Sequence, residues 1–155
     1  MKNYTLLVLK PDVIDEHIEQ YVLNRLKGRN LIAANRQEIR LSRKDVLILY
    51  PELASASYFD DLVEYLQSGP AVTFIVTGSD ALGGVNQLVG HPDPTLAAPG
   101  TFRKDFGKSF LHNGFHASSF SNADHEICHF YDLDRNTNIN AWILNAAPES
   151  ALALA

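Results

Sequence analysis

The sequence predicts an α/β (α+β) sandwich, in which helices cover one mostly antiparallel sheet. Short apolar, β-branched runs alternate along the chain with segments whose apolar residues recur at helical spacing. Several of the connections between these segments are short, which favours antiparallel neighbours. A chain of 155 residues is about one domain and is long enough to bury a core without disulfide bonds.

The first half of the chain contains two expected strands and two expected helices. Tyr4–Leu9 is rich in apolar and β-branched residues, as in a strand buried on both faces. A stripe of apolar residues over 14–28 predicts a helix, and a mixed run over 31–41 predicts an edge strand. Ser42 is expected to cap a short helix that ends near Leu49.

The middle of the chain continues the alternation. A second strongly amphipathic stripe predicts a helix over 58–66, and the Ser-Gly-Pro sequence at 68–70 ends it. A third strand over 71–77 and a helix over 80–89 follow. The order of elements so far is that of a sheet whose strands are joined through helices.

The last part of the chain is less regular. The segment 90–108 is rich in Pro and Gly and is expected to be a long loop, which in a compact domain usually serves function. A short fourth strand is expected around Phe115, and a last helix follows Ser121–Asp124, whose sequence suggests a capping box. Residues 133–155 lack periodicity and are expected to wrap the domain as a tail and then fray.

Composition narrows the class of protein. The formal net charge is −5 and no run of Lys and Arg stands out, which argues against a module that binds nucleic-acid duplexes. No stretch approaches the ~18 apolar residues of a membrane span, and Tyr4–Leu9 is too short for a signal peptide. Cys128, the only cysteine, is interpreted as a buried thiol rather than a nucleophile. We therefore expect a cytoplasmic protein with no membrane partner.

Polar residues concentrate between Thr101 and His116. Glycines nearby let backbone N–H groups approach phosphate oxygens, and an arginine adds a planar fork that matches them. A solvated loop with ordinary surface charges would have the same composition, so the residues alone leave both interpretations open. The segment contains Thr101, Arg103, Lys104, Asp105, Lys108, His112, Asn113 and His116.

His116 is the candidate nucleophile of this segment. An imidazole is a competent nucleophile near neutral pH because a good fraction of it is uncharged. One ring nitrogen must attack while an acceptor holds the other and fixes the tautomer, and Glu126, on the next expected helix, is a candidate for that acceptor. A packed, hydrogen-bonded core histidine would account for the same residues.

Four motifs, taken together, favour the interpretation of His116 as a nucleophile over that of a packed core histidine. They are Lys10-Pro11-Asp12 after the first strand, Ser68-Gly69-Pro70 before the third, Pro99-Gly100-Thr101-Phe102-Arg103-Lys104-Asp105-Phe106 and Asn113-Gly114-Phe115-His116-Ala117-Ser118. In this order and at this spacing the chain resembles the nucleoside diphosphate kinases, from about Thr5 to Phe130.

The resemblance implies a fold and a reaction. Its fold is a ferredoxin-like βαββαβ core, a four-stranded antiparallel sheet covered by helices, expected here over 1–132 with a partly ordered C-terminal tail over 133–155. The reaction is a two-step exchange in which a nucleoside triphosphate gives its γ-phosphate to a histidine and a diphosphate takes it, assisted by Mg²⁺. No residue of this chain is assigned as a ligand of that metal.

The resemblance also implies roles for individual residues. His116 corresponds to the phosphate-carrying histidine, and Glu126 and Ser118 belong with it as catalytic residues. Lys10 and Asn113 correspond to the residues that hold the sugar and phosphates. The remaining correspondences are a tyrosine near the histidine at Tyr50, the arginine on the phosphates at Arg103 and the aromatic ring that stacks on the base at Tyr58.

Several positions depart from the family pattern. A second phosphate-binding arginine is Asn86 here, a threonine phosphate ligand is Pro92, the arginine before the active-site asparagine is His112, and the aspartate of the histidine signature is Ser119. Each lost phosphate contact is expected to cost on the order of 1.5–3 kcal/mol. His91 and His112 replace lost charge only if they are protonated beside the phosphates, and the simpler interpretation is that both are exposed loop residues.

The departures leave alternatives open. The first is an active but slow nucleoside diphosphate kinase acting on nucleoside di- and triphosphates such as ATP, ADP and GTP. The second is a weak or inactive nucleotide-binding scaffold, as in divergent relatives associated with cilia or flagella. A third, a regulatory module for another small ligand, predicts no nucleotide at Tyr58 or Arg103. Family members are usually oligomers, so a homo-oligomer is expected.

Overall fold

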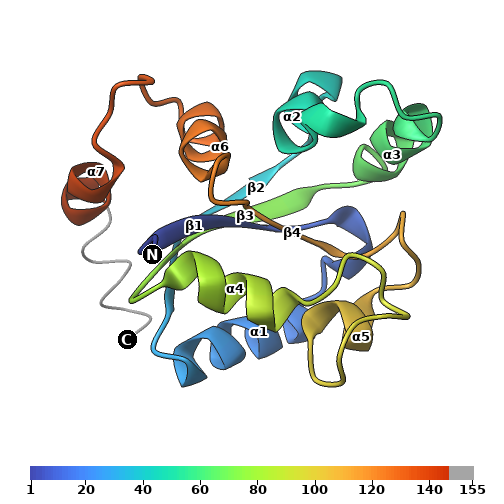
Figure 1. The fold of residues 1–155 in the computed structure, drawn as a ribbon, viewed down its shortest axis with the longest axis horizontal. Coiled ribbons are helices and arrows are strands. Elements are labelled where there is room, and N and C mark those ends of the chain that lie inside the picture. The colour runs from blue at the N-terminus through green and yellow to red at the C-terminus, as the bar shows by residue number, and fades with distance from the viewer. Residues whose placement is uncertain (147–155) are drawn as a thin grey trace.

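The computed structural model describes residues 1–146 as one layered domain (Figure 1). The four strands are β1 (Tyr4–Leu9), β2 (Ile32–Ile39), β3 (Ala71–Thr77) and β4 (Phe115–Ala117). The α-helices are α1 (Glu16–Gly28), α2 (Arg43–Leu49), α3 (Phe59–Leu66), α4 (Ala81–Val89), α5 (Phe102–Phe106), α6 (Ala123–Phe130) and α7 (Ile139–Ala146). Two short 3₁₀ turns, Pro11–Val13 and Pro51–Leu53, each begin with a proline.

The sheet has the order β2-β3-β1-β4, and every neighbouring pair is antiparallel. The predicted four-stranded antiparallel sheet of a ferredoxin-like α+β fold is therefore confirmed. β4 is only three residues long, yet it places His116 directly opposite Val8 of the central strand. The position of the candidate nucleophile is thus fixed by backbone pairing in the middle of the protein.

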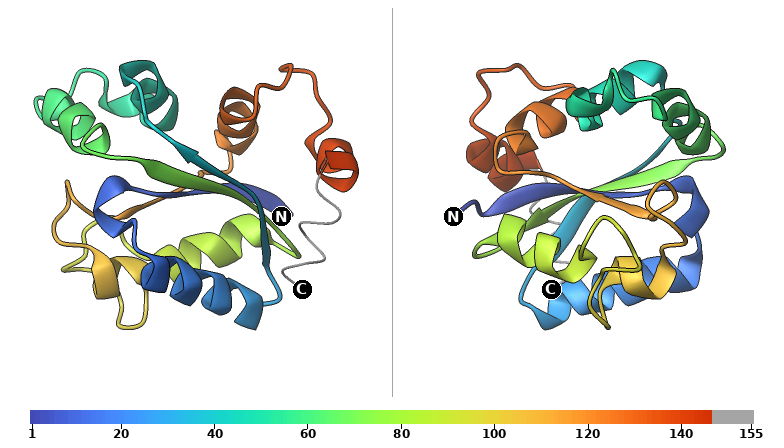
Figure 2. Two further views of the ribbon diagram at one scale, coloured as in Figure 1. Left: turned by 180° about the vertical axis from the view of Figure 1, so that it is seen from behind. Right: turned by 45° about the vertical axis from the view of Figure 1, so that its right-hand side comes forward.

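Helices cover both faces of the sheet (Figures 1 and 2). α1, α4 and α5 lie on one face, and α2, α3, α6 and α7 lie on the other. Because successive side chains of a strand point to opposite faces, β1 contributes to both cores. Leu7 and Leu9 pack in the first core and Leu6 and Val8 in the second, and all four are fully buried. The apolar run of the first strand is explained by this double burial.

The predicted N-terminal cap is present in α2 and absent in α6. At α2 the Ser42 hydroxyl accepts from the Asp45 amide at 3.1 Å, and the Asp45 carboxylate accepts from the Ser42 amide at 2.8 Å, so the predicted cap is confirmed. The capping box expected for α6 is wrong, because its N-cap Asn122 makes no side-chain cap bond. Asn122 has helical backbone angles, whereas a capping residue needs an extended backbone to reach the helix amides.

The long loop over 90–108 is partly helical, which its Pro and Gly content concealed. Thr101 caps α5 by accepting from the Lys104 amide at 3.3 Å. Phe102, the first residue of α5, is fully buried against the core of α1 and α4, and its ring lies 5.4 Å from that of Phe115. The loop is therefore anchored to the domain at the point where it carries Arg103.

The C-terminal segment contains a helix that the sequence analysis did not predict. α7 packs Ile139, Trp142 and Ile143 against the core shared by α2, α3 and α6. The ring of Trp142 lies 5.9 Å from that of Tyr131. The tail was expected to wrap the domain, and residues 139–146 lie against it, but as a helix that was not predicted. The expected fraying falls on 147–155, outside the described residues.

If Phe102 anchors the loop, its truncation should destabilise the fold. We expect Phe102→Ala to lower the free energy of unfolding by about 3–5 kcal/mol, as for other buried phenylalanines. Urea denaturation followed by circular dichroism measures it. Phe120→Ala is the matched control, because Phe120 is 62% exposed, and it should stay within about 1 kcal/mol of the parent. Equal effects of the two changes would show that Phe102 is no anchor.

Candidate active site

One cleft of about 480 Å³ brings together the residues predicted from the sequence. It is lined from both helical layers, by residues of α2, α3 and α6 on one side and by α4, α5 and the loops after them on the other. The predicted residues that line it are Lys10, Tyr50, Tyr58, Asn86, Arg103, Asn113, His116 and Glu126. Ser118, the remaining one, is fully buried behind His116.

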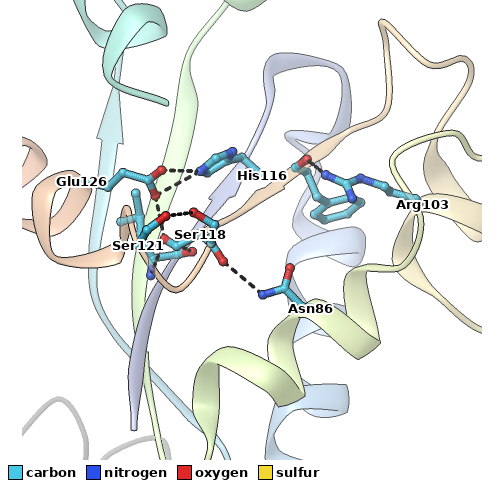
Figure 3. A network of polar contacts seen from close by, with 9 residues as sticks. Asn86, Arg103, His116, Ser118, Ser121 and Glu126 are labelled. Atoms are coloured by element: carbon cyan, nitrogen blue, oxygen red, sulfur yellow. Dashed lines mark hydrogen bonds and ion pairs between the residues drawn. The ribbon is translucent and has the colours of Figure 1, made fainter. Parts of the chain in front are cut away.

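His116 is held by a buried carboxylate (Figure 3). Its Nε2 lies 3.0 Å from Oε1 and 3.1 Å from Oε2 of Glu126. Its ring stands edge-on to Tyr50, with the centroids 5.0 Å apart. Among the described residues, Nδ1 of His116 has no hydrogen-bond partner. The ring is therefore oriented through Nε2, and Nδ1 is the nitrogen left for chemistry.

Ser118 completes the support of this carboxylate. Its hydroxyl donates to Oε1 of Glu126 at 2.6 Å, and the Leu6 amide donates to that hydroxyl at 3.2 Å. Glu126 lies in the first turn of α6, where the unpaired amides of the helix favour negative charge. With both oxygens near Nε2, an ionised Glu126 favours the neutral imidazole tautomer that has its proton on Nε2.

Lys10 directly follows β1, and the residue is buried, with 2% of its surface exposed. Nζ donates to Oδ1 of Asn113 at 2.7 Å and lies 5.1 Å from the centre of the Tyr50 ring. Burial, with the nearby charge of Arg103 added, lowers the pKa of Lys10 to about 7. The charged form of this amine therefore lacks a counter-ion, and a phosphate in the cleft would supply one and raise the pKa again.

Arg103 braces the same end of the cleft. Its guanidinium donates to the Gly90 carbonyl at 2.7 Å and to the Phe115 carbonyl at 2.8 Å. Its Nε is buried and has no partner among the described residues. Burial lowers the pKa of this group as well. Gly90 is required here, since it has φ +89° and an added Cβ would lie 2.6 Å from Thr101.

Two asparagines on the cleft wall are tied to backbone. Nδ2 of Asn113 donates to the Pro92 carbonyl at 3.0 Å. Nδ2 of Asn86 donates to the Leu82 carbonyl at 2.9 Å and to the Ser118 carbonyl at 3.0 Å. Asn86 thus joins α4 to the end of β4 and presents no positive charge to the cleft, where the family pattern has an arginine.

The two histidines considered as substitutes for lost charge do not line the cleft. Nδ1 of His91 accepts from the Asp93 amide at 2.9 Å, within its own loop. The His112 ring lies on Tyr65, with centroids 4.3 Å apart. Both are exposed, as the simpler interpretation held. The cationic side chains that line the cleft are therefore Lys10 and Arg103.

Phe110 is a cleft residue that the sequence analysis missed. Its ring lies 6.1 Å from that of Tyr58 and nearly perpendicular to it, and it is 52% exposed. The signal in the sequence was an aromatic residue within the mainly polar segment that leads to Asn113. The two rings give the cleft an apolar, aromatic corner, in which the face of one ring can take a planar ligand.

Some polar atoms in this region lack partners. The Tyr50 hydroxyl is buried with no hydrogen bond among the described residues, and burial raises its pKa. Because it lines the cleft beside Lys10, it is available as a donor to a bound ligand. In the described part of the chain, no set of three or more His, Cys, Asp or Glu side chains is arranged to hold a metal ion. No helix there has the length and apolar content to cross a membrane.

Comparison with known proteins identifies the family. The family model "Nucleoside diphosphate kinase" matches residues 3–135. A nucleoside diphosphate kinase of Campylobacter hominis is 37% identical over 128 residues, which are 82% of this chain and 93% of that protein. One of Helicobacter pylori is 35% identical over 132 residues, covering 84% of this chain and 96% of its own length.

Solved structures agree in fold over most of the chain. The nucleoside diphosphate kinase of Halobacterium salinarum, in complex with CDP, superposes with a TM-score of 0.78 at 29% identity and covers 92% of this chain and 99% of its own. The apo enzyme of Encephalitozoon cuniculi gives a TM-score of 0.80 at 27% identity with the same coverage. The resemblance that the motifs suggested is confirmed: the chain belongs to the nucleoside diphosphate kinase family of phosphotransferase enzymes.

Proposed function

We propose that this chain moves the terminal phosphate between nucleotides on Nδ1 of His116. The observation that carries the proposal is the contact of Nε2 with the buried carboxylate of Glu126, at 3.0 and 3.1 Å. It orients the ring and leaves Nδ1 as the nucleophile. A packed core histidine would not need to line a cleft of about 480 Å³ beside two cationic side chains.

The chemistry takes place in two balanced steps. In the first, the lone pair of Nδ1 attacks the γ-phosphorus of a nucleoside triphosphate, a P–N bond forms, and the bond to the β-phosphate oxygen breaks. The diphosphate leaves, and the Nε2 proton stays against Glu126, whose charge stabilises the imidazolium that develops. In the second step, a terminal oxygen of another diphosphate attacks the phosphorus and the P–N bond breaks.

The other site residues bind the nucleotide and neutralise the charge of its phosphates. Phosphoryl transfer needs positioning and charge neutralisation more than covalent help from the protein. Lys10 and Arg103 supply the positive charge, Asn113 orients the Lys10 ammonium group, and the Tyr50 hydroxyl donates to a phosphate or sugar oxygen. The face of the Tyr58 ring stacks on the base, beside the edge-on ring of Phe110. Stacking tolerates different bases because every base has a flat face. The Halobacterium relative was solved with CDP.

Mg²⁺ fits this cleft as part of the nucleotide. The lining offers cations for phosphate oxygens rather than a cluster of carboxylates, and Mg²⁺ in such sites is held mainly by phosphates and water. When bound, the ion neutralises phosphate charge and orients the transferred group. Lys10 and Arg103 then hold the phosphate oxygens that the ion leaves free.

Assembly and location extend the proposal. β2 is an edge strand within one chain, and its unpaired side offers a place for a second copy, so we propose a homo-oligomer. The family is known for oligomers and for nucleotide binding. We further propose that the protein acts in the cytoplasm. Association with a cilium or flagellum belongs with the second candidate function.

The second candidate is a nucleotide-binding domain that turns over slowly or not at all. Asn86 favours it, because its amide donates to two carbonyls of the backbone where the family pattern has a cation. Pro92 also lines the cleft and offers neither a hydroxyl nor an N–H group. Fewer phosphate contacts weaken binding of the transition state as well as of the substrate, so this chain is expected to be slower than typical relatives.

Phosphorylation tests the nucleophile. We expect γ-labelled ATP to transfer label to the protein. The label should be acid-labile, because the acceptor is the ring nitrogen Nδ1 of His116, and His116→Ala should abolish it. Mass spectrometry of the labelled protein locates the phosphate. His125→Gln is a control on another, exposed histidine. Label that persists in His116→Ala would rule the proposal out.

Restoring a cation tests the second candidate. We expect Asn86→Arg to raise kcat/KM for ATP about tenfold, the value of roughly one charge-assisted contact. Asn140→Arg on α7 is the matched control, because it adds the same charge at an exposed position outside the cleft. An unchanged or lower kcat/KM in Asn86→Arg would mean that the missing cation does not limit the rate.

Lys10 links nucleotide binding to pH. Its free pKa is about 7, and a bound phosphate raises it, so binding of ADP should take up protons above pH 7 and take up few at pH 6, where Lys10 is already charged. Calorimetry in buffers of different ionisation enthalpy measures this uptake. Lys10→Arg, which stays charged, should remove it. The same uptake in both proteins would assign it to another group.

A further inference from the structure

A partly buried hydrogen bond joins the two helices on either side of His116. Nε2 of His129, on α6, lies 2.7 Å from Oδ1 of Asp45, on α2. The side chains are 22% and 19% exposed. Among the described residues, this is the side-chain hydrogen bond that links α2 to α6. It lies outside the nucleotide cleft, since neither residue lines it.

Asp45 divides its carboxylate between two tasks. Its second oxygen, Oδ2, accepts from the Ser42 amide at 2.8 Å and starts α2. Burial opposes the charge, but the hydrogen bonds from Ser42 and His129 outweigh it and hold the pKa of Asp45 below its usual value. The carboxylate is therefore ionised at neutral pH. The same group fixes where α2 begins and where α6 lies against it.

Both helices place a side chain against the ring of His116. Glu126 precedes His129 by one turn on the same helix, so a shift of α6 that moves one side chain moves the other. Tyr50 is the C-cap of α2, and its ring stands edge-on to the imidazole at 5.0 Å. His116 thus lies between a side chain of α6 and a side chain of α2, and the spacing of the two helices sets how tightly it is held.

We propose that His129, through its contact with Asp45, is a positioning residue for phosphoryl transfer at His116. Its loss lets α6 move relative to α2, which lengthens the contact of Glu126 with Nε2 and frees the ring. The inference deepens the proposed function and rests on it. Misplacement of a reacting group by a fraction of a bond length lowers the rate of the chemical step far more than it weakens substrate binding.

The experiment compares two substitutions on α6 with the same change of side chain. His129→Leu removes the contact with Asp45. His125→Leu, one turn earlier, replaces an exposed histidine that has no side-chain partner among the described residues. His129→Gln is the conservative variant, since its amide can still donate to Oδ1. We expect His129→Leu to slow single-turnover phosphorylation of His116 about tenfold with little change in KM for ATP, and the other two to stay within about threefold.

A double-mutant cycle shows whether His129 acts through Glu126. In a Glu126→Gln background the effect of His129→Leu should shrink to less than about twofold, because the contact it positions is already weakened. If His129 only stabilised the fold, His129→Leu would lower the melting temperature, and the effects of His129→Leu and Glu126→Gln on the rate would be independent. Equal rates for His129→Leu and His125→Leu, or a change confined to KM, would overturn the inference. If His129→Leu does not fold, Asp45→Asn weakens the same contact and should slow the same step.

A second readout separates this inference from the proposed function. ¹⁵N NMR of the His116 ring reports the Nε2–H tautomer without any turnover. We expect His129→Leu to lower the population of this tautomer and His129→Gln to keep it. If the parent protein takes no label from ATP, the proposed function fails, while the tautomer shift still shows whether the His129 contact positions the ring. An unshifted tautomer in His129→Leu overturns the inference.

Discussion

The buried contact between His116 and Glu126 is the interaction on which the rest of the site depends. A carboxylate with 1% of its surface exposed is tolerated only with partners, and here the imidazole and the Ser118 hydroxyl supply them. The contact exists because β4 pairs with the central strand and α6 packs above it. The sheet positions the His116 ring, and Glu126 of α6, held by the Ser118 hydroxyl, contacts its Nε2. Nδ1 is left free. Removing the carboxylate would release the ring from that orientation.

Charge around this contact is scarce. Lys10 and Arg103 line the cleft; Lys10 is buried and Arg103 half-buried, and burial lowers the pKa of both. A bound phosphate favours the charged form of both groups, so it offsets the cost of their burial. Arg103 also donates to the Phe115 carbonyl of β4 and to the Gly90 carbonyl at the end of α4, which fixes its position before substrate arrives. Asn86 continues this pattern: it braces backbone where a cation would contact phosphate.

The sequence predicted those parts of the fold that local pattern determines. Strands appeared as apolar runs, and the Ser42 cap appeared because its partner is three residues away. The predicted site residues converge because motifs in register place them on known elements. α7 was missed because its stripe, Ile139, Trp142 and Ile143, is only about one turn long and is followed at once by the exposed apolar residue Leu144. The predicted cap of α6 failed because backbone angles decide capping, and composition does not reveal them.

Contacts between distant segments were beyond local pattern. His129 and Asp45 are 84 residues apart, and nothing near either one indicates the other. Phe110 was likewise hidden, because its importance comes from the contact of its ring with Tyr58, in a different part of the chain. The same applies to Asn86: the sequence showed that a cation was missing there, whereas only the fold shows the amide bonding to the Ser118 carbonyl.

The central claim is that Nδ1 of His116 carries the phosphate because Glu126 occupies Nε2. Its most direct test is heteronuclear NMR of the phosphorylated protein with ¹⁵N-labelled histidine, in which a coupling to ³¹P identifies the bonded nitrogen. The account predicts coupling at Nδ1 of His116, with the proton retained on Nε2. Coupling at Nε2, or phosphate on another residue, would contradict it.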